Sequence, residues 1–150
     1  MNKVSVISTP LGYLKLTAHN DALLGCTWVK KSEVSHANSM ILKTAATQLK
    51  WYFAKKLTRF DIPLAPEGTD FQKKVWDALL QVPYGETGSY QDIANHIGHA
   101  KAARAVGNAN GKNPLCIFIP CHRVIQASGN IGGYSSGVTY KVELLALESV

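Results

Sequence analysis

The stretch that decides the fold runs from residue 89 to residue 124 and reads SYQDIANHIGHAKAARAVGNANGKNPLCIFIPCHRV. Ser89 followed three residues later by Asp92 is typical of a helix start, where side chain and backbone bond each other reciprocally. This helix is expected to end at Gly98. A second helix, over about residues 101–108, follows after only a few residues. Such a pair has the helix-turn-helix layout that presents one helix to DNA.

The second helix carries very little side-chain bulk around Arg104. Its small residues are Ala102, Ala103, Ala105, Gly107 and Ala109. The minor groove of B-DNA is only about 6 Å wide, so a helix that enters it must be slim, and an inserted side chain such as Arg104 unstacks bases. The alternative is that the alanines are ordinary helix formers packed inside the fold. The absence of Asp and Glu between Ile93 and Val142 favours DNA.

The expected chemical centre follows the apolar run Leu115–Ile119, which predicts a buried strand. Pro120 favours a strand end, so we expect a turn at Cys121 that lets this thiol and His122 cooperate. A free thiol has a pKa near 8.5, and a neighbouring base or cation, here His122 or Arg123, is needed to stabilise the thiolate. The alternative is a buried structural cysteine beside an exposed histidine, and Cys116 is interpreted in that structural way.

Towards the N-terminus, alternating apolar residues predict three strands. The alternating residues are Val4 and Val6, then Leu14, Leu16 and Ala18, then Leu24, Cys26 and Trp28. A helix over about residues 36–56 is expected next. Its predicted apolar face consists of Met40, Leu42, Ala45, Ala46, Leu49, Trp51 and Phe53.

Residues 61–70 interrupt both periodicities with Pro63, Pro66 and Gly68 and predict a linker. We therefore expect an N-terminal α/β lobe of structural role at 1–68 and a C-terminal lobe at 69–150. A helix capped by Thr69 or Asp70 should open the second lobe and run to about residue 81. The predicted class is α+β: a small antiparallel sheet with a helix, then a winged helix-turn-helix-like lobe.

The composition favours a folded globule with an anionic partner. The chain has 150 residues, of which 46% are hydrophobic and 17% charged, so it has enough apolar material for a core. Its formal charge of +6 puts nucleic acid first among possible partners. The lysines of residues 1–70 are spread out and are given no binding role.

The cysteine content and the hydropathy of the sequence indicate where in the cell the protein is expected. Cys26, Cys116 and Cys121 are an odd number in a chain without a secretory pattern, which indicates reduced thiols inside a cell. The cytoplasm is favoured, near the nucleoid in a prokaryote, with the nucleus as the eukaryotic equivalent. No apolar run is long enough for a bilayer, so no membrane role is expected.

Residues 120–124 (PCHRV), preceded by Asn113-Pro114 and by KAARAVG at 101–107, resemble the O6-alkylguanine-DNA alkyltransferase family. The resemblance covers roughly residues 69–149. It implies direct DNA repair: an alkylated guanine, chiefly O6-methylguanine, is flipped out of double-stranded DNA approached through the minor groove. A cysteine takes the alkyl group irreversibly, so each molecule acts once, as a monomer and without a cofactor.

The resemblance also implies residue roles. Cys121 would accept the alkyl group, His122 would act as the base through a water, and Glu148 would orient the imidazole. Tyr90 would donate its hydroxyl to the guanine ring, and Asn113 would brace the turn before the active site. The implied DNA contacts are Arg104, which fills the vacated space in the stack, and Ala102, Ala103, Ala105, Gly107, Tyr90 and Arg123.

A glycine-rich segment, GGYSSG at 132–137, resembles the family's active-site loop. Gly132 and Gly133 would let the backbone close on a flat base. Tyr134 would line the pocket, Ser135 would contact the guanine oxygen, and backbone groups of Cys121 and Val124 would read the guanine edge.

The sequence departs from the family near its end, where Val142, Glu143 and Leu147 replace frequent residues, so the last helix is expected to pack differently. Some members bind zinc in the N-terminal lobe. Here Cys26 has no partner cysteine nearby, and His19 or His36 makes a poor tetrahedral set, so no metal is predicted.

Two other functions compete with alkyl transfer. Alkyltransferase-like proteins share the DNA-binding lobe, bind the lesion and leave it in place, but they lack the acceptor cysteine, whereas this chain has Cys121. A Cys-His hydrolase would need an oxyanion hole and turnover, for which no sequence feature argues.

Overall fold

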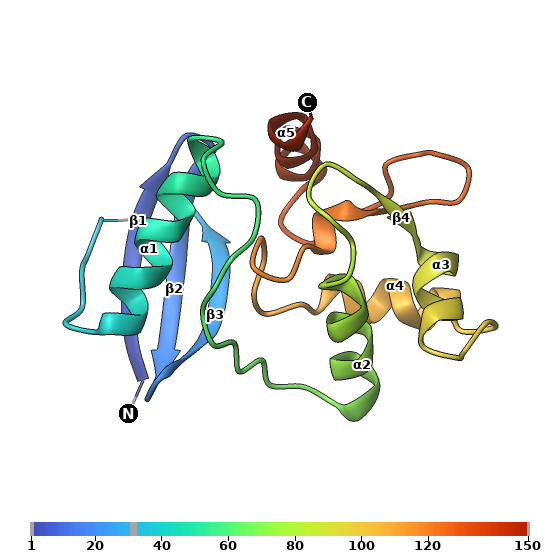
Figure 1. Ribbon diagram of the computed structural model, residues 1–150, viewed down its shortest axis with the longest axis horizontal. Coiled ribbons are helices and arrows are strands. Elements are labelled where there is room, and N and C mark those ends of the chain that lie inside the picture. Colours follow the sequence, from blue (N-terminus) through green and yellow to red (C-terminus); the bar gives the residue numbers. More distant parts are fainter. Residues whose placement is uncertain (1, 31–32, 150) are drawn as a thin grey trace. The chain divides into compact units, whose positions relative to one another are not determined.

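The predicted α+β class is confirmed by the computed structural model, which describes residues 2–30 and 33–149 (Figure 1). Two compact units divide the chain. The first comprises Met1–Glu67 and Pro114–Phe118, and the second comprises Gly68–Asn113 and Ile119–Val150. The chain therefore passes between the units three times, once next to the predicted boundary at residue 68. The separate roles assigned to 1–68 and 69–150 stay predictions.

The first unit contains a three-stranded antiparallel meander, as the alternating pattern predicts. Strands β1 (Asn2–Thr9), β2 (Gly12–His19) and β3 (Ala22–Val29) lie in that order. Leu14 and Leu16 of β2 are fully buried. A register irregularity between Thr17 and Ala18 pairs Ala18 with Leu23 of β3. Because a one-residue shift changes the face of every side chain beyond it, Leu23 is buried where the sequence predicts Leu24.

One helix, α1 (Met40–Phe53), packs on this sheet (Figure 1). The prediction placed its start at residue 36, which is wrong by four residues because the Ser39 side chain accepts from the Leu42 N–H and caps the helix. The apolar face is also shifted. Tyr52 is buried, whereas Met40 and Trp51 are exposed.

The predicted linker at 61–70 contributes to the first unit through backbone pairing. Leu23 donates its N–H to Pro63 O and accepts from the Ala65 N–H, both at 2.8 Å. At its start, the buried Gln48 side chain both donates to Asp61 O and accepts from the Asp61 N–H. The first part of the linker is therefore fixed along β3 and α1 by these four hydrogen bonds.

The predicted strand at residues 115–119 is wrong, although all five side chains are buried. Leu115 forms only an isolated parallel bridge with Cys26 of β3. The chain then turns at Ile117, whose φ is +73°, and Phe118 donates back to Cys116 O. A short apolar run identifies burial but does not distinguish a strand from a buried turn.

The second unit contains the helix pair that the sequence predicts. Helix α2 (Asp70–Leu79) is capped by Thr69, and α3 (Tyr90–His96) by Ser89; both have the reciprocal capping box. Helix α4 (Ala103–Gly111) begins two residues later and ends three residues later than expected. Trp76 of α2 donates its indole N–H to Ala109 O of α4 at 2.9 Å, which joins these two helices in the core.

The remaining elements hold the region around Cys121. A single 3₁₀ turn spans Cys121–Arg123, which confirms the predicted turn. It leads into β5 (Val124–Ile125), which pairs in parallel with β4 (Gly88–Ser89), just before α3. Helix α5 (Val138–Glu148) packs against the 3₁₀ turn.

Candidate active site

Cys121 lies at the start of the 3₁₀ turn and lines a cavity of about 370 Å³ in the second unit. The cavity is formed by Tyr90, Gly107, Asn110, Gly111, Cys121, Gly133, Tyr134 and Ser135. The structure thus brings predicted residues from α3, α4, the 3₁₀ turn and the glycine-rich loop around one thiol. Val124 and Gly132, which were also predicted for the pocket, are not among the described residues that line this cavity.

A buried ion network lies directly behind the thiol. His122 Nε2 is 2.7 Å from Glu148 Oε2 at the end of α5. Arg123 contacts both oxygens of the same carboxylate, at 2.7 Å from Nε and 3.0 Å from Nη2. All three side chains are buried. A carboxylate that accepts from three donors is well compensated for its loss of hydration.

The surroundings of His122 favour one protonation state. Desolvation lowers the pKa of the imidazole below 6.5, more than the bond to Glu148 raises it. Arg123 already compensates the negative charge of Glu148. Protonation of His122 would therefore gain little further electrostatic stabilisation from this carboxylate. A carboxylate only accepts, so the neutral ring carries its proton on Nε2. Nδ1 is then an acceptor, and it is buried without a hydrogen-bond partner among the described residues.

Lys141 of α5 is a buried cation on the opposite side of the loop. Its ammonium donates to Val124 O at 2.6 Å and to Gly133 O at 3.0 Å. It also lies 5.8 Å from the ring centroid of Tyr90. Desolvation lowers the pKa of Lys141 to about 8, opposed by interaction with Cys121. Lys141 therefore ties the glycine-rich loop to β5.

Tyr90 opens α3 and reaches the cavity because Ser89 caps the helix immediately before it. Burial raises the pKa of its hydroxyl, with a further contribution from Cys121. The hydroxyl therefore keeps its proton at neutral pH. A Cβ at Gly132, whose φ is +75°, would lie 3.0 Å from the Tyr90 hydroxyl oxygen, so only glycine fits there without displacing it.

Two asparagines hold the backbone on either side of Pro120. Asn113 donates from Nδ2 to Ile119 O at 2.8 Å, the contact expected of a bracing residue. Asn110 of α4 donates from Nδ2 to Cys121 O at 3.3 Å, while its Oδ1 is buried without a partner. The cysteine backbone is therefore attached to the second helix of the helix-turn-helix pair.

The predicted DNA-binding residues divide into two groups. Arg104 and Ala105 are exposed on α4, Ala102 and Ala103 are half-buried at its start, and Gly107 faces Tyr90. Arg123 is different. Its guanidinium is buried against Glu148 and Val82 O, so its contribution in this structure is internal, and its contact with DNA stays a prediction.

Sequence reasoning missed Asn110 and Lys141 as site residues. Asn110 falls three residues after Gly107, so it lies on the same helix face as a residue predicted to bind DNA, and this spacing is a usable signal. Lys141 stands among apolar residues of α5, but a lone lysine there is usually solvated, and only its burial identifies it.

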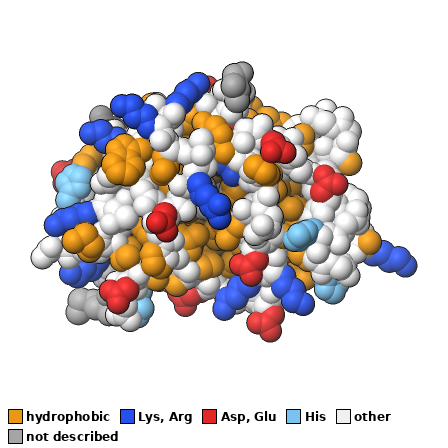
Figure 2. Space-filling view, viewed as in Figure 1, with side chains coloured by type: hydrophobic (Ala, Val, Ile, Leu, Met, Phe, Trp, Pro, Cys, Tyr) orange, Lys and Arg blue, Asp and Glu red, His pale blue; other side chains and the backbone are white. Residues whose placement is uncertain are grey.

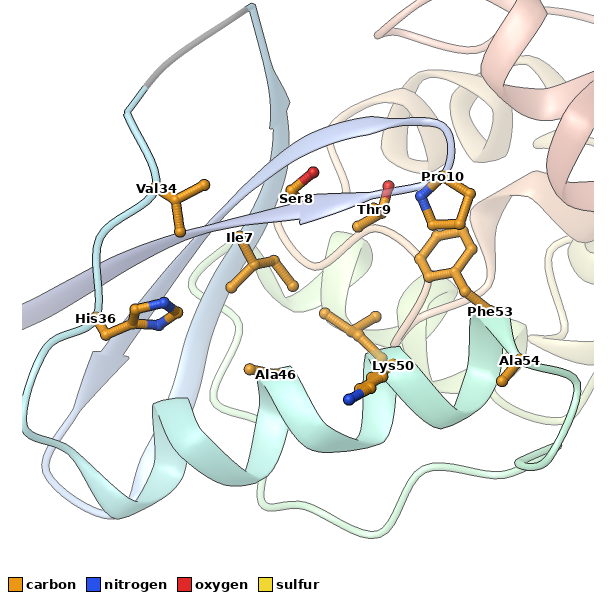
Figure 3. A pocket seen from close by; sticks show the side chains of 11 residues that line it. Ile7, Ser8, Thr9, Pro10, Val34, His36, Ala46, Lys50, Phe53 and Ala54 are labelled. Atoms are coloured by element: carbon orange, nitrogen blue, oxygen red, sulfur yellow. The ribbon is translucent and has the colours of Figure 1, made fainter.

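The first unit has its own cavity, of about 440 Å³, between β1 and α1. Figure 3 shows the side chains of Ile7, Ala46 and Phe53 around it. Among the described residues, no cysteine and none of the predicted site residues lines this cavity, so it offers no thiol.

On one face of the molecule, the surface charge is distributed rather than concentrated. On the face visible in Figure 2, lysine and arginine side chains occur in several separate places with carboxylates between them.

In the described part of the chain, residues 2–30 and 33–149, no group of three or more His, Cys, Asp or Glu side chains is placed to hold a metal ion. Across those same ranges, no helix has the length and hydropathy needed to cross a membrane.

Both units match known protein domains. Residues 2–66 match the ribonuclease-like domain of 6-O-methylguanine DNA methyltransferase, and residues 70–150 match its DNA-binding domain. A methylated-DNA–protein-cysteine methyltransferase from Methanosarcina acetivorans is 46% identical over 150 residues, which cover 96% of each chain.

Solved structures give the same result. The O6-methylguanine methyltransferase of Mycobacterium tuberculosis superposes with a TM-score of 0.89 at 45% identity, over 99% of this chain and 93% of that one. A structure of the M. tuberculosis protein in complex with DNA has the same TM-score at 47% identity, over 97% and 91% of the chains.

Proposed function

Because the chain belongs to the 6-O-methylguanine DNA methyltransferase family, we propose that it repairs DNA by moving the alkyl group of O6-alkylguanine onto its own Cys121. The observation that carries the assignment is the arrangement of Cys121, His122 and Glu148. The thiol lines a cavity, and the next residue is a neutral imidazole held by a buried carboxylate. The protein acts as a single-turnover transferase.

The first step is deprotonation of the thiol. The bare Nδ1 of His122 is a buried acceptor, and a water between it and Cys121 Sγ passes the thiol proton to the ring. Glu148 fixes the tautomer and compensates the imidazolium that forms, and Arg123 keeps the carboxylate ionised.

The second step is a direct displacement. The Cys121 thiolate attacks the alkyl carbon, an S–C bond forms, and the bond from that carbon to guanine O6 breaks. The electron pair passes into the purine, and the Tyr90 hydroxyl donates to the ring so that guanine leaves as a neutral base. The thioether is stable, so Cys121 is not regenerated.

DNA reaches this site as a duplex approached through the minor groove by α4. Arg104 is the exposed side chain that occupies the space left by the flipped nucleotide. Cys121 O accepts from Asn110 Nδ2 and from the Val124 N–H, and Val124 O accepts from Lys141 Nζ. Backbone groups of Cys121 and Val124 read the edge of the flipped guanine. Ser135 and Tyr134 complete the pocket. The protein acts as a monomer in the compartment that holds the DNA, the cytoplasm of a prokaryotic cell.

The test is an intact-mass spectrum after incubation with duplex DNA that carries O6-methylguanine, followed by peptide mapping. The expected result is a gain of one CH₂ on Cys121 and plain guanine in the DNA. Cys121→Ala is the matched control and should bind the DNA without any gain in mass. Tight binding by the unaltered protein with no change in mass would instead indicate a lesion-binding protein and overturn the proposal.

A further inference from the structure

Two thiols that the proposed repair reaction does not use lie in contact within the first unit. Cys26 of β3 and Cys116 have their Sγ atoms 3.8 Å apart, although they are 90 residues apart in sequence. Both are buried: Cys26 is fully inaccessible, and Cys116 is 7% exposed. Neither is in a disulfide.

Their proximity is fixed by the backbone as well as by side-chain packing. The Cys26 N–H donates to Pro114 O at 2.8 Å, and the Cys116 N–H donates to Cys26 O at 3.0 Å. These two bonds form the parallel bridge that joins β3 to the 114–118 segment. The bond length of a disulfide is about 2.05 Å, so the sulfur atoms have to approach by only roughly 1.8 Å, which side-chain rotation supplies.

We propose that Cys26 and Cys116 form a peroxide-sensitive dithiol that closes to an intramolecular disulfide. Cys116 reacts first because it retains the only solvent exposure of the two. Cys116 is followed by the turn at Ile117 and Phe118. This turn makes few backbone hydrogen bonds and therefore opens more readily than the sheet. Cys26 is the resolving thiol.

The chemistry balances with hydrogen peroxide as the oxidant. The Cys116 sulfur attacks the O–O bond, which breaks; Cys116 becomes a sulfenic acid and one water leaves with the thiol proton. The Cys26 sulfur then attacks that sulfur, an S–S bond forms, the S–O bond breaks, and a second water leaves. Two thiols and one peroxide give one disulfide and two waters.

Closure changes the behaviour of the whole chain. The new bond joins residues 90 apart and restricts the unfolded chain, so the oxidised protein should melt at a higher temperature than the reduced one. It also fixes the 114–118 segment to β3 covalently, three residues before Cys121.

The experiment uses the full chain with Cys121→Ser, so that Cys26 and Cys116 are the only thiols left. After peroxide treatment, the intact mass should fall by two hydrogen atoms, and non-reducing digestion should yield a linked pair of peptides that contain Cys26 and Cys116. Dithiothreitol should restore the mass. The melting temperature should rise by several degrees on oxidation and return on reduction.

Two control variants in the same background separate the pair from ordinary oxidation. Cys26→Ser and Cys116→Ala should each lose the linked peptide and the rise in melting temperature. If one variant does not fold, the other and the parent protein still give both readouts. Addition of oxygen atoms to either cysteine, a disulfide between two molecules, or two unmodified thiols at peroxide doses that oxidise Cys121 in the unaltered chain would each overturn the proposal.

Discussion

Arg123 and Arg104 carry the same charge, but their surroundings are opposite. The Arg123 guanidinium is buried against Glu148, and the Arg104 side chain is exposed on α4. Removing a buried partner leaves an uncompensated charge, whereas removing an exposed one leaves only solvent. Substitution of Arg123 therefore reports on internal stabilisation, whereas substitution of Arg104 reports on DNA contact.

Arg123→Ala should lower the free energy of unfolding by about 3–5 kcal/mol, because Glu148 loses two of its three donors. Arg104→Ala, the matched control, should change that free energy by no more than about 0.5 kcal/mol yet slow alkyl transfer on duplex DNA strongly. Urea unfolding and single-turnover transfer rates measure both. Equal stability losses, or an unchanged transfer rate for Arg104→Ala, would contradict these roles.

His122 should make stability depend on pH. Its folded-state pKa lies below 6.5, so above 6.5 the ring is neutral in both states and the stabilisation is complete. As pH falls below 6.5, the unfolded chain binds a proton before the folded one does, and the free energy of unfolding decreases. Unfolding curves between about pH 7.5 and about pH 5 measure this loss. His122→Gln cannot titrate, so its loss of stability should be smaller; parallel curves would show that the histidine titrates normally.

For single residues, the sequence predicts which side chains belong to the site better than it predicts which side chains they contact. Cys121 and His122 can be found from the PCHRV segment because they are adjacent. The bond of His122 to Glu148 spans 26 residues and follows only from the family resemblance. Sequence charge does not distinguish the buried Arg123 guanidinium from the exposed Arg104 side chain.

At the scale of elements, α3 links helix capping to the reaction. Ser89 accepts from the Asp92 N–H and sets the first residue of the helix, Tyr90, at the cavity. Gly88, which precedes Ser89, pairs with Val124 of β5. The start of one helix thus determines where a site hydroxyl lies.

Ser89→Ala should lower the free energy of unfolding by about 1 kcal/mol, the usual effect of losing a side-chain cap. It should also slow alkyl transfer, because the first turn of α3 frays and Tyr90 loses its fixed position. Ser89→Thr keeps the accepting oxygen and should retain most of both properties. Chemical denaturation and transfer rates report the two effects. A transfer rate for Ser89→Ala equal to that of the unaltered chain would exclude the positioning role.

Local signals predicted the elements well where polar caps mark them. The capping residues Thr69 and Ser89 gave correct starts for α2 and α3. The predicted start of α1 at residue 36 is too early, because the apolar face begins only at Met40, directly after the Ser39 cap. The run at 115–119 was misassigned because tertiary burial, not strand pairing, accounts for its apolar residues.

For the whole molecule, the count of exposed cations determines how DNA binding responds to salt. Five Lys or Arg residues lie between residues 93 and 142, but Arg123 and Lys141 are buried. Lys101, Arg104 and Lys112 remain exposed. Sequence charge alone therefore overestimates the phosphate contacts of this segment.

Because Arg104 enters the base stack, Lys101 and Lys112 are left to contact phosphates. The logarithm of the DNA-binding constant should therefore fall with the logarithm of salt concentration with a slope of roughly −2, about −0.9 for each of these two contacts. Fluorescence anisotropy with undamaged duplex at several salt concentrations measures the slope. Lys112→Ala should make it less steep by about one, and Lys141→Met should leave it unchanged. A slope near zero would remove phosphate contact as the source of binding.

The three passages of the chain between its two units have a consequence for how such a protein arises and folds. Residues Pro114–Phe118 leave the second unit, pack into the first and return. A gene fragment that begins at residue 68 would therefore encode Leu115, Ile117 and Phe118 without the neighbours that bury them, and its product should aggregate. A fragment that ends at residue 67 would lack part of its own core. The first unit therefore takes part of its core from the second half of the sequence, and in this chain that half carries apolar residues which the first unit buries.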